Sequence, residues 1–345
     1  MIGTCQLGLR TILCPCPGQV RASLPRKPAP RSRLVFKGAR AQAASVGTQT
    51  QSSTAGNGGS AQPSVQQGST PSPGGAVQDS PPLLPPAGIL AKAVELGAAK
   101  ANLPIAKCFA LSIMGGIFIA FGGALAVSVG PNCPGVAQAN PGLLKMITGF
   151  NGLPFGLLLV MVCGAELFTG NVALLATAVF NGKATWKQLA QNWSVSYVGN
   201  MLGTFLIVTL MTQGAVFPQM ASGPINTAMP KVGLTFSQAF LRACLANWFV
   251  CLATWMAIGA NSLISKIGGI YLTISSFVAI GLEHSVANMF IIPLAMTLGA
   301  DISLGTYLFK NLLPVTLGNI VGGAIGVAAF YSFVYGKLGQ KTQEA

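Results

Sequence analysis

Acidic residues are scarce in this sequence, and charged residues of either sign are few. Six Asp and Glu stand against 20 Lys and Arg, and only 8% of the 345 residues are charged. An ordinary soluble domain contains about 25% charged residues, whereas the mean hydropathy of this chain is +0.61. These values exclude a typical soluble enzyme and predict a polytopic integral membrane protein.

Metal-binding and nucleotide-binding patterns are absent as well. The chain has a single His, and its eight Cys form no paired metal motif, because Cys14-Pro15-Cys16 has no second pair. One His and two intramembrane Glu cannot build a di-metal site, so we expect no metal and no cofactor. A membrane-embedded enzyme is therefore disfavoured. Without a nucleotide-binding loop, any active transport would be secondary.

The net charge of +14 does not indicate nucleic-acid binding. Eight basic residues and one acid, Asp79, lie within residues 1–87, and most of the remaining basic residues stand at the ends of apolar runs. No basic patch is interleaved with aromatic residues, so we expect no nucleic-acid partner.

The N-terminal segment has the composition of a targeting sequence. Residues 1–40 contain no acid, and Arg10 interrupts their one short apolar stretch, which is typical of an organelle transit peptide and not of a secretory signal. Composition favours plastid over mitochondrion only slightly, and a disordered basic tail is the alternative. Residues 41–87, rich in Gln, Ser, Gly and Pro, are predicted to be a disordered linker. The transmembrane domain is predicted at residues 88–345.

Six apolar runs follow, and each exceeds the roughly 20 residues needed to cross a bilayer. Two of them are interrupted at their centres by polar residues, Glu166 and Asn171 in the second run, and Glu283 and Asn288 in the fifth. We therefore expect six transmembrane helices, of which the second and fifth are broken. The runs lie near residues 105–130, 150–181, 191–212, 236–260, 268–298 and 306–335.

The distribution of Lys predicts the orientation. With six spans, both termini lie on one side, together with most of the Lys residues of the membrane domain. The positive-inside rule then places both termini on the stromal side if the membrane is the chloroplast inner envelope. Only three Lys fall on the other side, namely Lys145, Lys231 and Lys310.

Two polar motifs occur twice with identical spacing. They are Gly164-x-Glu166-x4-Asn171 with Gly281-x-Glu283-x4-Asn288, and Asn192-x6-Gly199-Asn200-x2-Gly203 with Asn311-x6-Gly318-Asn319-x2-Gly322. Each half holds three spans, so the second half must enter the membrane from the opposite side. This predicts a 3+3 inverted repeat, in which the binding site lies at the midplane where the broken helices meet.

The only histidine, His284, lies in the interruption of the fifth span. An ionisable group at membrane depth indicates function, and a structural His bonded to loop backbone is the alternative. The half-helices expected to resume near Gly170 and Ala287 direct their N-terminal N–H groups to the midplane, where they favour an anion. Glu166 and Glu283 precede these helix starts and are interpreted as caps, with cation ligation as the alternative.

Four segments resemble the signature segments of the formate/nitrite transporter family. They are Met161–Gly170, Ala243–Ala253, Gly281–Leu294 and Asn311–Gly323. The resemblance covers residues 90–336. Together with the expected transit peptide, the chain looks most like the plastid-envelope branch of green algae, which is associated with nitrite and bicarbonate.

This resemblance implies an aquaporin-like protomer in a homopentamer surrounded by membrane lipid, with one pore per subunit. His284 would be the central pore histidine and Thr169 its hydrogen-bonding partner. Lys231 would gather anions on the far side, and Asn247 and Asn319 would be pore-region amides. Apolar constrictions would be formed by Leu157, Leu167, Phe168, Val250 and Phe277.

We therefore expect a channel or transporter that moves nitrite, and also formate-like weak acids, into the stroma for nitrate assimilation. A bicarbonate channel of the same fold is the alternative. A neutral-solute channel of aquaporin type is disfavoured because Asn-Pro-Ala segments are replaced by Asn171–Ala173 and Asn288–Phe290. Arg242 either adds anion attraction at a pore entrance or is an interfacial residue.

Overall fold

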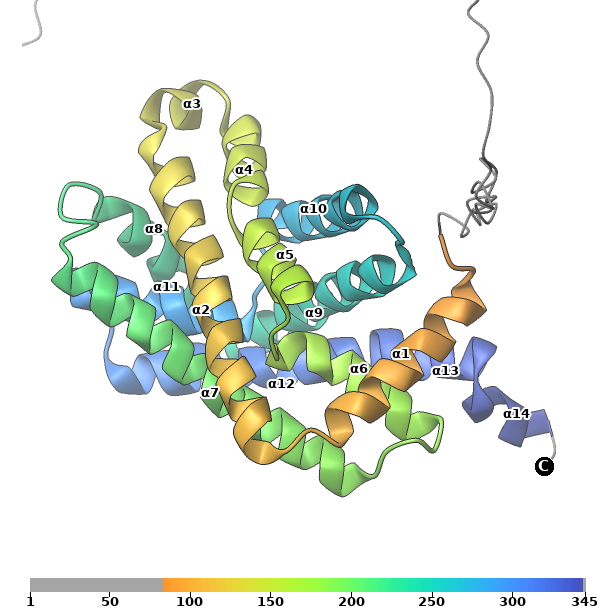
Figure 1. The fold of residues 1–345 in the computed structure, drawn as a ribbon. Coiled ribbons are helices and arrows are strands. Elements are labelled where there is room, and N and C mark those ends of the chain that lie inside the picture. Colours follow the sequence, from red (N-terminus) through yellow and green to blue (C-terminus); the bar gives the residue numbers. More distant parts are fainter. Residues whose placement is uncertain (1–82, 344–345) are drawn as a thin grey trace, which may run out of the picture. The chain divides into compact units, whose positions relative to one another are not determined.

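The computed structural model describes residues 83–343, and the regular elements of this part are helices (Figure 1). The expected transit peptide at 1–40 and most of the expected linker at 41–87 lie outside the described residues. The first helix, α1 (Pro86–Ala101), begins just before the expected start of the membrane domain. Its first residue is Pro86, whose fixed φ suits the first helical position.

Six helical segments within residues 83–343 are long and apolar enough to cross a membrane, which confirms the expected number. Two shorter apolar helices, α6 (Phe168–Phe180) and α11 (Ser285–Thr297), complete the second and fifth spans. The six segments are Ile105–Asn132, Pro141–Cys163, Trp186–Gln213, Phe236–Gly259, Leu263–Ile280 and Thr306–Tyr335.

The second and fifth spans are broken, as the sequence predicts. In the second span, α4 (Pro141–Phe150) and α5 (Leu153–Cys163) are followed by an extended stretch before α6. In the fifth, α10 (Leu263–Ile280) is followed by a similar stretch before α11. Each break opens with a glycine at positive φ, Gly164 at 79° and Gly281 at 86°, a conformation that glycine adopts without steric cost.

The two halves pack in the same way. In the first half, α2 (Ile105–Val129) lies against α7 (Trp186–Gln213), and in the second, α9 (Phe236–Gly259) lies against α12 (Leu313–Gly323). Glycines permit the close approach: a Cβ on Gly203 would lie 2.1 Å from the Ile113 carbonyl oxygen, and one on Gly322 would lie 2.0 Å from that of Cys244. Small residues at such spacing are typical of tightly packed membrane helices.

Helices outside the six spans pack against the two short helices that follow the breaks. Helix α1 packs along α6, and α8 (Ser222–Val232) packs against α11. The last span contains two π-helical segments, a feature associated with inserted residues in helices. The remaining elements are η1 (Gly130–Asn132), α3 (Pro134–Ala139), η2 (Thr306–Leu312), η3 (Ala324–Ala329), α13 (Phe330–Tyr335) and α14 (Lys337–Gln343).

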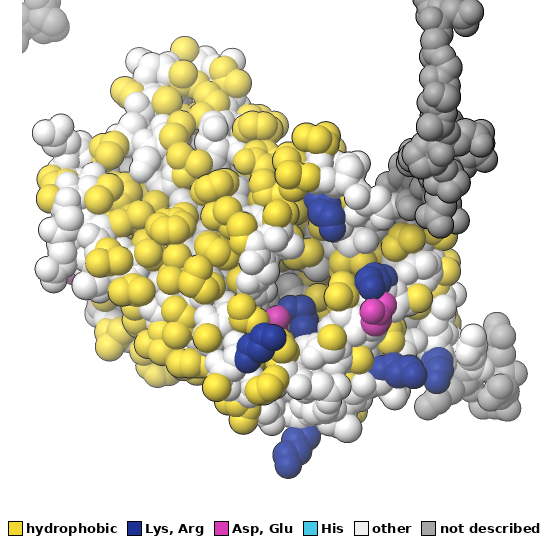
Figure 2. Space-filling view, in the orientation of Figure 1, with side chains coloured by type: hydrophobic (Ala, Val, Ile, Leu, Met, Phe, Trp, Pro, Cys, Tyr) yellow, Lys and Arg dark blue, Asp and Glu magenta, His cyan; other side chains and the backbone are white. Residues whose placement is uncertain are grey.

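The outer surface of the described part is strongly apolar. Figure 2 shows hydrophobic side chains over much of the face formed by α2, α4 and α5, with charged side chains gathered near α1. Large apolar residues elsewhere are exposed as well, including Leu272, Ile264 and Phe309. Such a surface is suited to lipid or to a second subunit.

Candidate functional site

His284 and Thr169 join the two halves at the centre of the fold. His284 Nε2 lies 2.9 Å from Thr169 Oγ1, and both residues are buried. Thr169 lies in the first turn of α6, after the first break, and His284 lies in the second break. Their hydrogen bond therefore joins one half of the repeat to the other. The structure thus brings together the two residues that the family resemblance pairs.

The second ring nitrogen of His284 fixes its tautomer. The Ala287 backbone N–H donates to Nδ1 over 3.0 Å, so His284 caps α11. Because Nδ1 is an acceptor, a neutral ring carries its proton on Nε2 and donates to Thr169. One nitrogen of His284 thus bonds to the backbone, while the other carries an N–H group at the junction of the halves.

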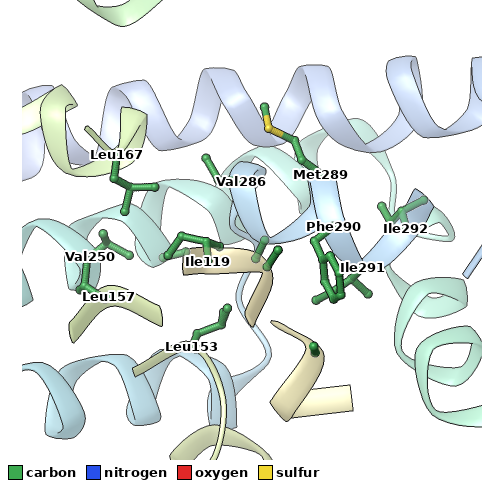
Figure 3. Close-up of a cluster of buried hydrophobic side chains, with 14 of the residues drawn as sticks. Ile119, Leu153, Leu157, Leu167, Val250, Val286, Met289, Phe290, Ile291 and Ile292 are labelled. Atoms are coloured by element: carbon green, nitrogen blue, oxygen red, sulfur yellow. The ribbon is translucent and has the colours of Figure 1, made fainter. Parts of the chain in front are cut away.

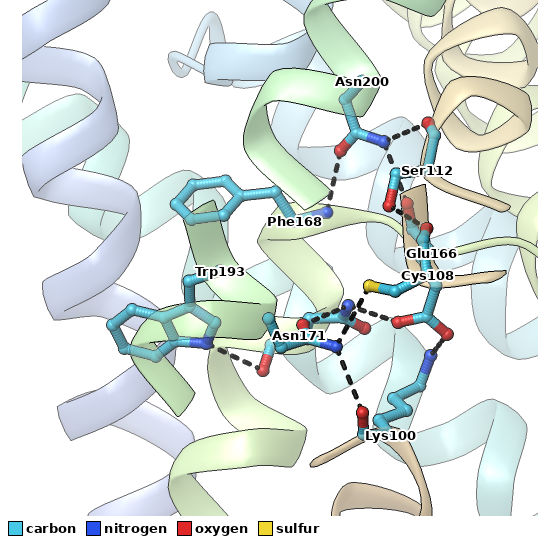
Figure 4. A network of polar contacts seen from close by, with 9 residues as sticks. Lys100, Cys108, Ser112, Glu166, Phe168, Asn171, Trp193 and Asn200 are labelled. Atoms are coloured by element: carbon cyan, nitrogen blue, oxygen red, sulfur yellow. Dashed lines mark hydrogen bonds and ion pairs between the residues drawn. The ribbon is translucent and has the colours of Figure 1, made fainter. Parts of the chain in front are cut away.

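The interpretation of Glu166 and Glu283 as helix caps is wrong. Glu283 Oε1 pairs with Lys231 Nζ at 3.0 Å, and its Oε2 accepts from Asn288 Nδ2 at 2.7 Å. Glu166 repeats this arrangement with Lys100 and Asn171 (Figure 4). Both carboxylates therefore bind side chains, and each Lys–Glu pair is largely buried.

Asparagine side chains, and not the carboxylates, cap the broken helices. Asn200 Oδ1 accepts from Phe168 N, and Asn319 Oδ1 accepts from Ser285 N, each over 2.8 Å. Both amides also donate to backbone carbonyls, including that of the preceding Glu in each break. Asn200 and Asn319 occupy the same position in the two copies of the repeated motif. Asn319 was already a candidate site residue, so a comparison of the two copies identifies Asn200 as a second one.

The remaining amides hold the same framework. Asn247, expected in the pore, donates to the backbone oxygens of Thr169 and Asn319 and is fully buried. Asn192 accepts from Asn171, as Asn311 accepts from Asn288. Asn247 and Asn319 therefore bond to the backbone around the breaks, which makes them supports of the site.

Two chambers lie beside the breaks, and His284 lines the first of them. One has a volume of about 250 Å³ and is bordered by Lys231, Arg242, Glu283 and His284. We call it the Lys231 chamber. The other has a volume of about 370 Å³ and is bordered by residues that include Lys100, Glu166 and Gly170. We call it the Lys100 chamber.

A narrow apolar void lies between the chambers. Its volume is about 10 Å³, near the lower limit for holding one water molecule. Figure 3 shows several of its side chains converging from α2, α5, α9 and the first break. The void is lined by His284 with Ile119, Leu153, Leu157, Leu167, Val250, Ile274 and Phe277.

Phe168 does not line this void, although the resemblance places it at a constriction. Its ring packs edge-on against Tyr197, with centroids 5.0 Å apart, and against Trp193 at 6.4 Å. Phe168 is the first residue of α6, so its side chain points away from that of the preceding Leu167. Ile119, Leu153 and Ile274 were missed, although two of them are the repeat counterparts of Val250 and Leu157.

Lys231 and Arg242 border the same chamber. Lys231 is not free, because it is paired with Glu283 and only 16% of its side chain is exposed. Arg242 is exposed and borders this chamber, which fits both expectations for it, a residue at a pore entrance and an interfacial residue. Lys100 was missed because it belongs to the short α1, which was not among the expected spans.

These features define a membrane transport protein: an inverted repeat of helices with two chambers that meet at an apolar constriction. The family model described as Formate/nitrite transporter matches residues 87–333. The chain belongs to the formate/nitrite transporter family.

Related sequences and structures agree with this assignment. The chain is 40% identical over 255 residues to the probable formate transporter of Methanothermobacter thermautotrophicus, covering 68% of this chain and 91% of the relative. It is 35% identical over 275 residues to the formate channel FocA of Escherichia coli (strain K12), covering 73% and 95%. These relatives are a transporter and a channel, so this chain is a transport protein and not an enzyme.

Two solved structures share the fold. An FNT family ion channel aligns with a TM-score of 0.66 and 28% identity over 71% of this chain and 98% of that one. A pentameric formate channel with formate bound aligns with a TM-score of 0.59 and 32% identity over 67% and 97%. The fold predicted from the repeat is therefore confirmed.

Proposed function

We propose that this protein conducts small monovalent anions through the path formed by the Lys231 chamber, the constriction and the Lys100 chamber. The observation that carries this proposal is the constriction at His284, which shares lining residues with both chambers. Relatives described as formate channels and transporters support the same substrate class.

The physical basis is a sequence of attraction and dehydration. The ammonium groups of Lys231 and Lys100 are each neutralised by a Glu, so the attraction comes from the N-terminal ends of α6 and α11, which give a positive potential at the midplane. The 10 Å³ void has no room for a hydrated ion. An anion must therefore lose its water there, and it pays a high cost unless its charge is neutralised.

His284 offers one N–H group where this cost is greatest. A bound anion could accept the Nε2 proton as a hydrogen bond in place of Thr169, since both acceptors would approach the same nitrogen. A proton taken from water in the entry chamber, which leaves hydroxide there, converts the anion to a neutral weak acid that crosses the apolar ring more easily. The neutral His284 ring keeps its Nε2 proton and contributes a hydrogen bond, and water in the exit chamber takes the proton from the acid. The anion then leaves through the second chamber after losing that proton.

Formate and nitrite fit this path best. Each has three heavy atoms, whereas bicarbonate has four and needs a wider constriction. We propose nitrite as the physiological substrate and bicarbonate as the second candidate, since both are monovalent oxyanions of weak acids. The composition of residues 1–40 supports delivery to the chloroplast inner envelope, and the excess of Lys on the side of the termini supports a stromal orientation.

A pentamer is part of the same proposal. One solved structure with this fold is described as a pentameric formate channel. The exposed apolar side chains of α7, α9 and α10 provide area for contacts between subunits as well as with lipid.

The test is anion uptake by the purified protein in proteoliposomes, with nitrite, formate and bicarbonate compared side by side and glycerol as the neutral control. Flux of nitrite and formate above that of bicarbonate and glycerol is expected. Preferential bicarbonate flux would assign the protein a role in the supply of inorganic carbon, with the fold unchanged. Glycerol flux without anion flux would contradict the proposal.

A matched pair of variants on α6 tests the central hydrogen bond. Thr169→Val removes the partner of His284 with little change in volume, and we expect flux to fall about tenfold, the effect of losing one buried hydrogen bond. Thr177→Val is the control, because the Thr177 hydroxyl is buried without a hydrogen-bond partner in the described part of the chain. Equal flux in the two variants would remove the hydrogen bond from the mechanism.

A further inference from the structure

The internal repeat allows the two chambers to be compared position by position. Lys100 and Lys231 stand 131 positions apart, and so do Ile119 and Val250, which both line the constriction. The same separation applied to Arg242 leads to Leu111, which borders the Lys100 chamber. Leu111 and Arg242 are thus equivalent positions on α2 and α9.

The difference between Leu111 and Arg242 changes the charge of the chambers. The Lys100 chamber has one Lys and one Glu, which form an ion pair, so the formal charge of its lining is zero. The Lys231 chamber has the equivalent ion pair and Arg242 in addition. Its lining carries one excess positive charge.

Arg242 has no carboxylate to neutralise it. No Asp or Glu lies within 4.0 Å of its guanidinium in residues 83–343, where the ion pairs involve only Lys92, Lys100 and Lys231. The Arg242 side chain is exposed, and the chamber beside it has a volume of about 250 Å³. A small anion therefore has room to approach the Arg242 guanidinium, which forms no ion pair within residues 83–343.

We propose that Arg242 forms an oxyanion-binding site in the Lys231 chamber and that the Lys100 chamber has no such site. The inference rests on the proposed anion transport and adds a loading site with its own selectivity. The guanidinium presents two parallel N–H groups, which match the two coplanar oxygens of formate, nitrite or bicarbonate. The Lys231 ammonium adds no such site, because Glu283 already neutralises it.

Two properties follow from this site. Oxyanions bind more tightly from the Lys231 side than from the Lys100 side, because only one chamber has the guanidinium. Oxyanions are also preferred over chloride at this site, because a spherical ion cannot use both N–H groups of the fork in the planar arrangement. We expect about a tenfold difference in the half-saturating concentration of formate, the low end for a charge-assisted hydrogen bond, because Arg242 is exposed to water.

The test is current through the purified full-length protein in planar bilayers, with sodium formate added to one side at a time. A C-terminal tag recognised by an antibody identifies the side of insertion, since α14 packs against α13, which contacts α1. Arg242→Gln should raise the half-saturating formate concentration from the Lys231 side about tenfold and leave the other side unchanged. Arg242→Lys should keep the attraction for chloride and lose the preference for formate.

A swap variant gives the sharpest outcome. Leu111→Arg combined with Arg242→Leu moves the guanidinium to the equivalent position of the other chamber, so the side of tighter formate binding should reverse. Elution as the same oligomer and an unchanged thermal midpoint serve as folding controls. If the swap does not fold, Arg242→Gln and Arg242→Lys decide the question alone.

The outcomes separate this inference from the proposed function. A wild-type protein that passes neither formate nor nitrite contradicts the proposed function. A wild-type current with the same side dependence in Arg242→Gln contradicts the oxyanion site alone. Line broadening of carbon-13-labelled formate by the purified protein tests the site without transport, and equal broadening by wild type and Arg242→Gln would overturn it.

Discussion

Removal of the Asn319 side chain should destabilise the protein more than removal of any exposed amide. Asn319 is fully buried; it accepts from Ser285 N and donates to the carbonyls of Ala243 and Glu283. Asn319→Ala removes a helix cap, which costs about 1 kcal/mol. It also leaves the carbonyls of Ala243 and Glu283 without this buried partner, at about 1 kcal/mol or more each. The expected loss is about 3 kcal/mol.

The assay is thermal unfolding of the purified protein in detergent, followed by intrinsic fluorescence. A loss of about 3 kcal/mol corresponds to a fall in the unfolding midpoint of roughly 6–12 °C for a domain of this size. Asn132→Ala is the matched control, because the exposed Asn132 amide donates only to Ser128 O. Its midpoint should change by about 1 °C or less.

A midpoint of Asn319→Ala equal to that of the control would refute the assignment of Asn319 as the support of the second break. Flux offers a second readout, because His284 lies between the two backbone groups that Asn319 holds. We expect anion flux to fall even below the unfolding temperature.

Two further predictions concern the ion pair and the helix packing. Glu283→Gln leaves the largely buried Lys231 without its partner and should lower the free energy of unfolding by about 3 kcal/mol. The control is Glu95→Gln, in an exposed pair with Lys92, which should lower it by less than about 0.5 kcal/mol. Thermal unfolding midpoints measure both variants, and equal shifts would contradict the stabilising role of the buried Lys231–Glu283 pair. Gly203→Val places a side chain against the backbone of α2 and should abolish the folded oligomer. Size-exclusion chromatography measures this loss, and an elution profile like that of the wild type would contradict the close packing of α2 and α7.

Much of the fold follows from the sequence because the apolar runs are long and the polar interruptions repeat. The two breaks were located within a few residues, since Gly164 and Gly281 and the polar residues after them stand out from the apolar background. The helix α1 was missed because its 16 residues are too few for a span and contain Lys92, Glu95 and Lys100.

The site was harder to predict because side-chain directions in the breaks depend on backbone torsions. Glu166 and Glu283 precede helix starts in the sequence, yet they turn toward Lys100 and Lys231, which lie 66 and 52 positions away. Similarly, Leu167 reaches the constriction while the adjacent Phe168 packs on α7. The spacing of motifs does not predict which distant segments come into contact. It also does not predict toward which side two consecutive side chains point.

The central claim is that anions pass through both chambers, and a pair of glycine substitutions tests it most directly. A Cβ on Gly170 would face the Lys100 chamber and meet only Thr254 Oγ1 at 3.6 Å, while a Cβ on the exposed Gly268 would meet nothing within 4 Å. Formate and nitrite flux in proteoliposomes should be blocked by Gly170→Phe, which fills the chamber, and should be unchanged by Gly268→Phe. Wild-type flux through a folded Gly170→Phe protein would contradict the account.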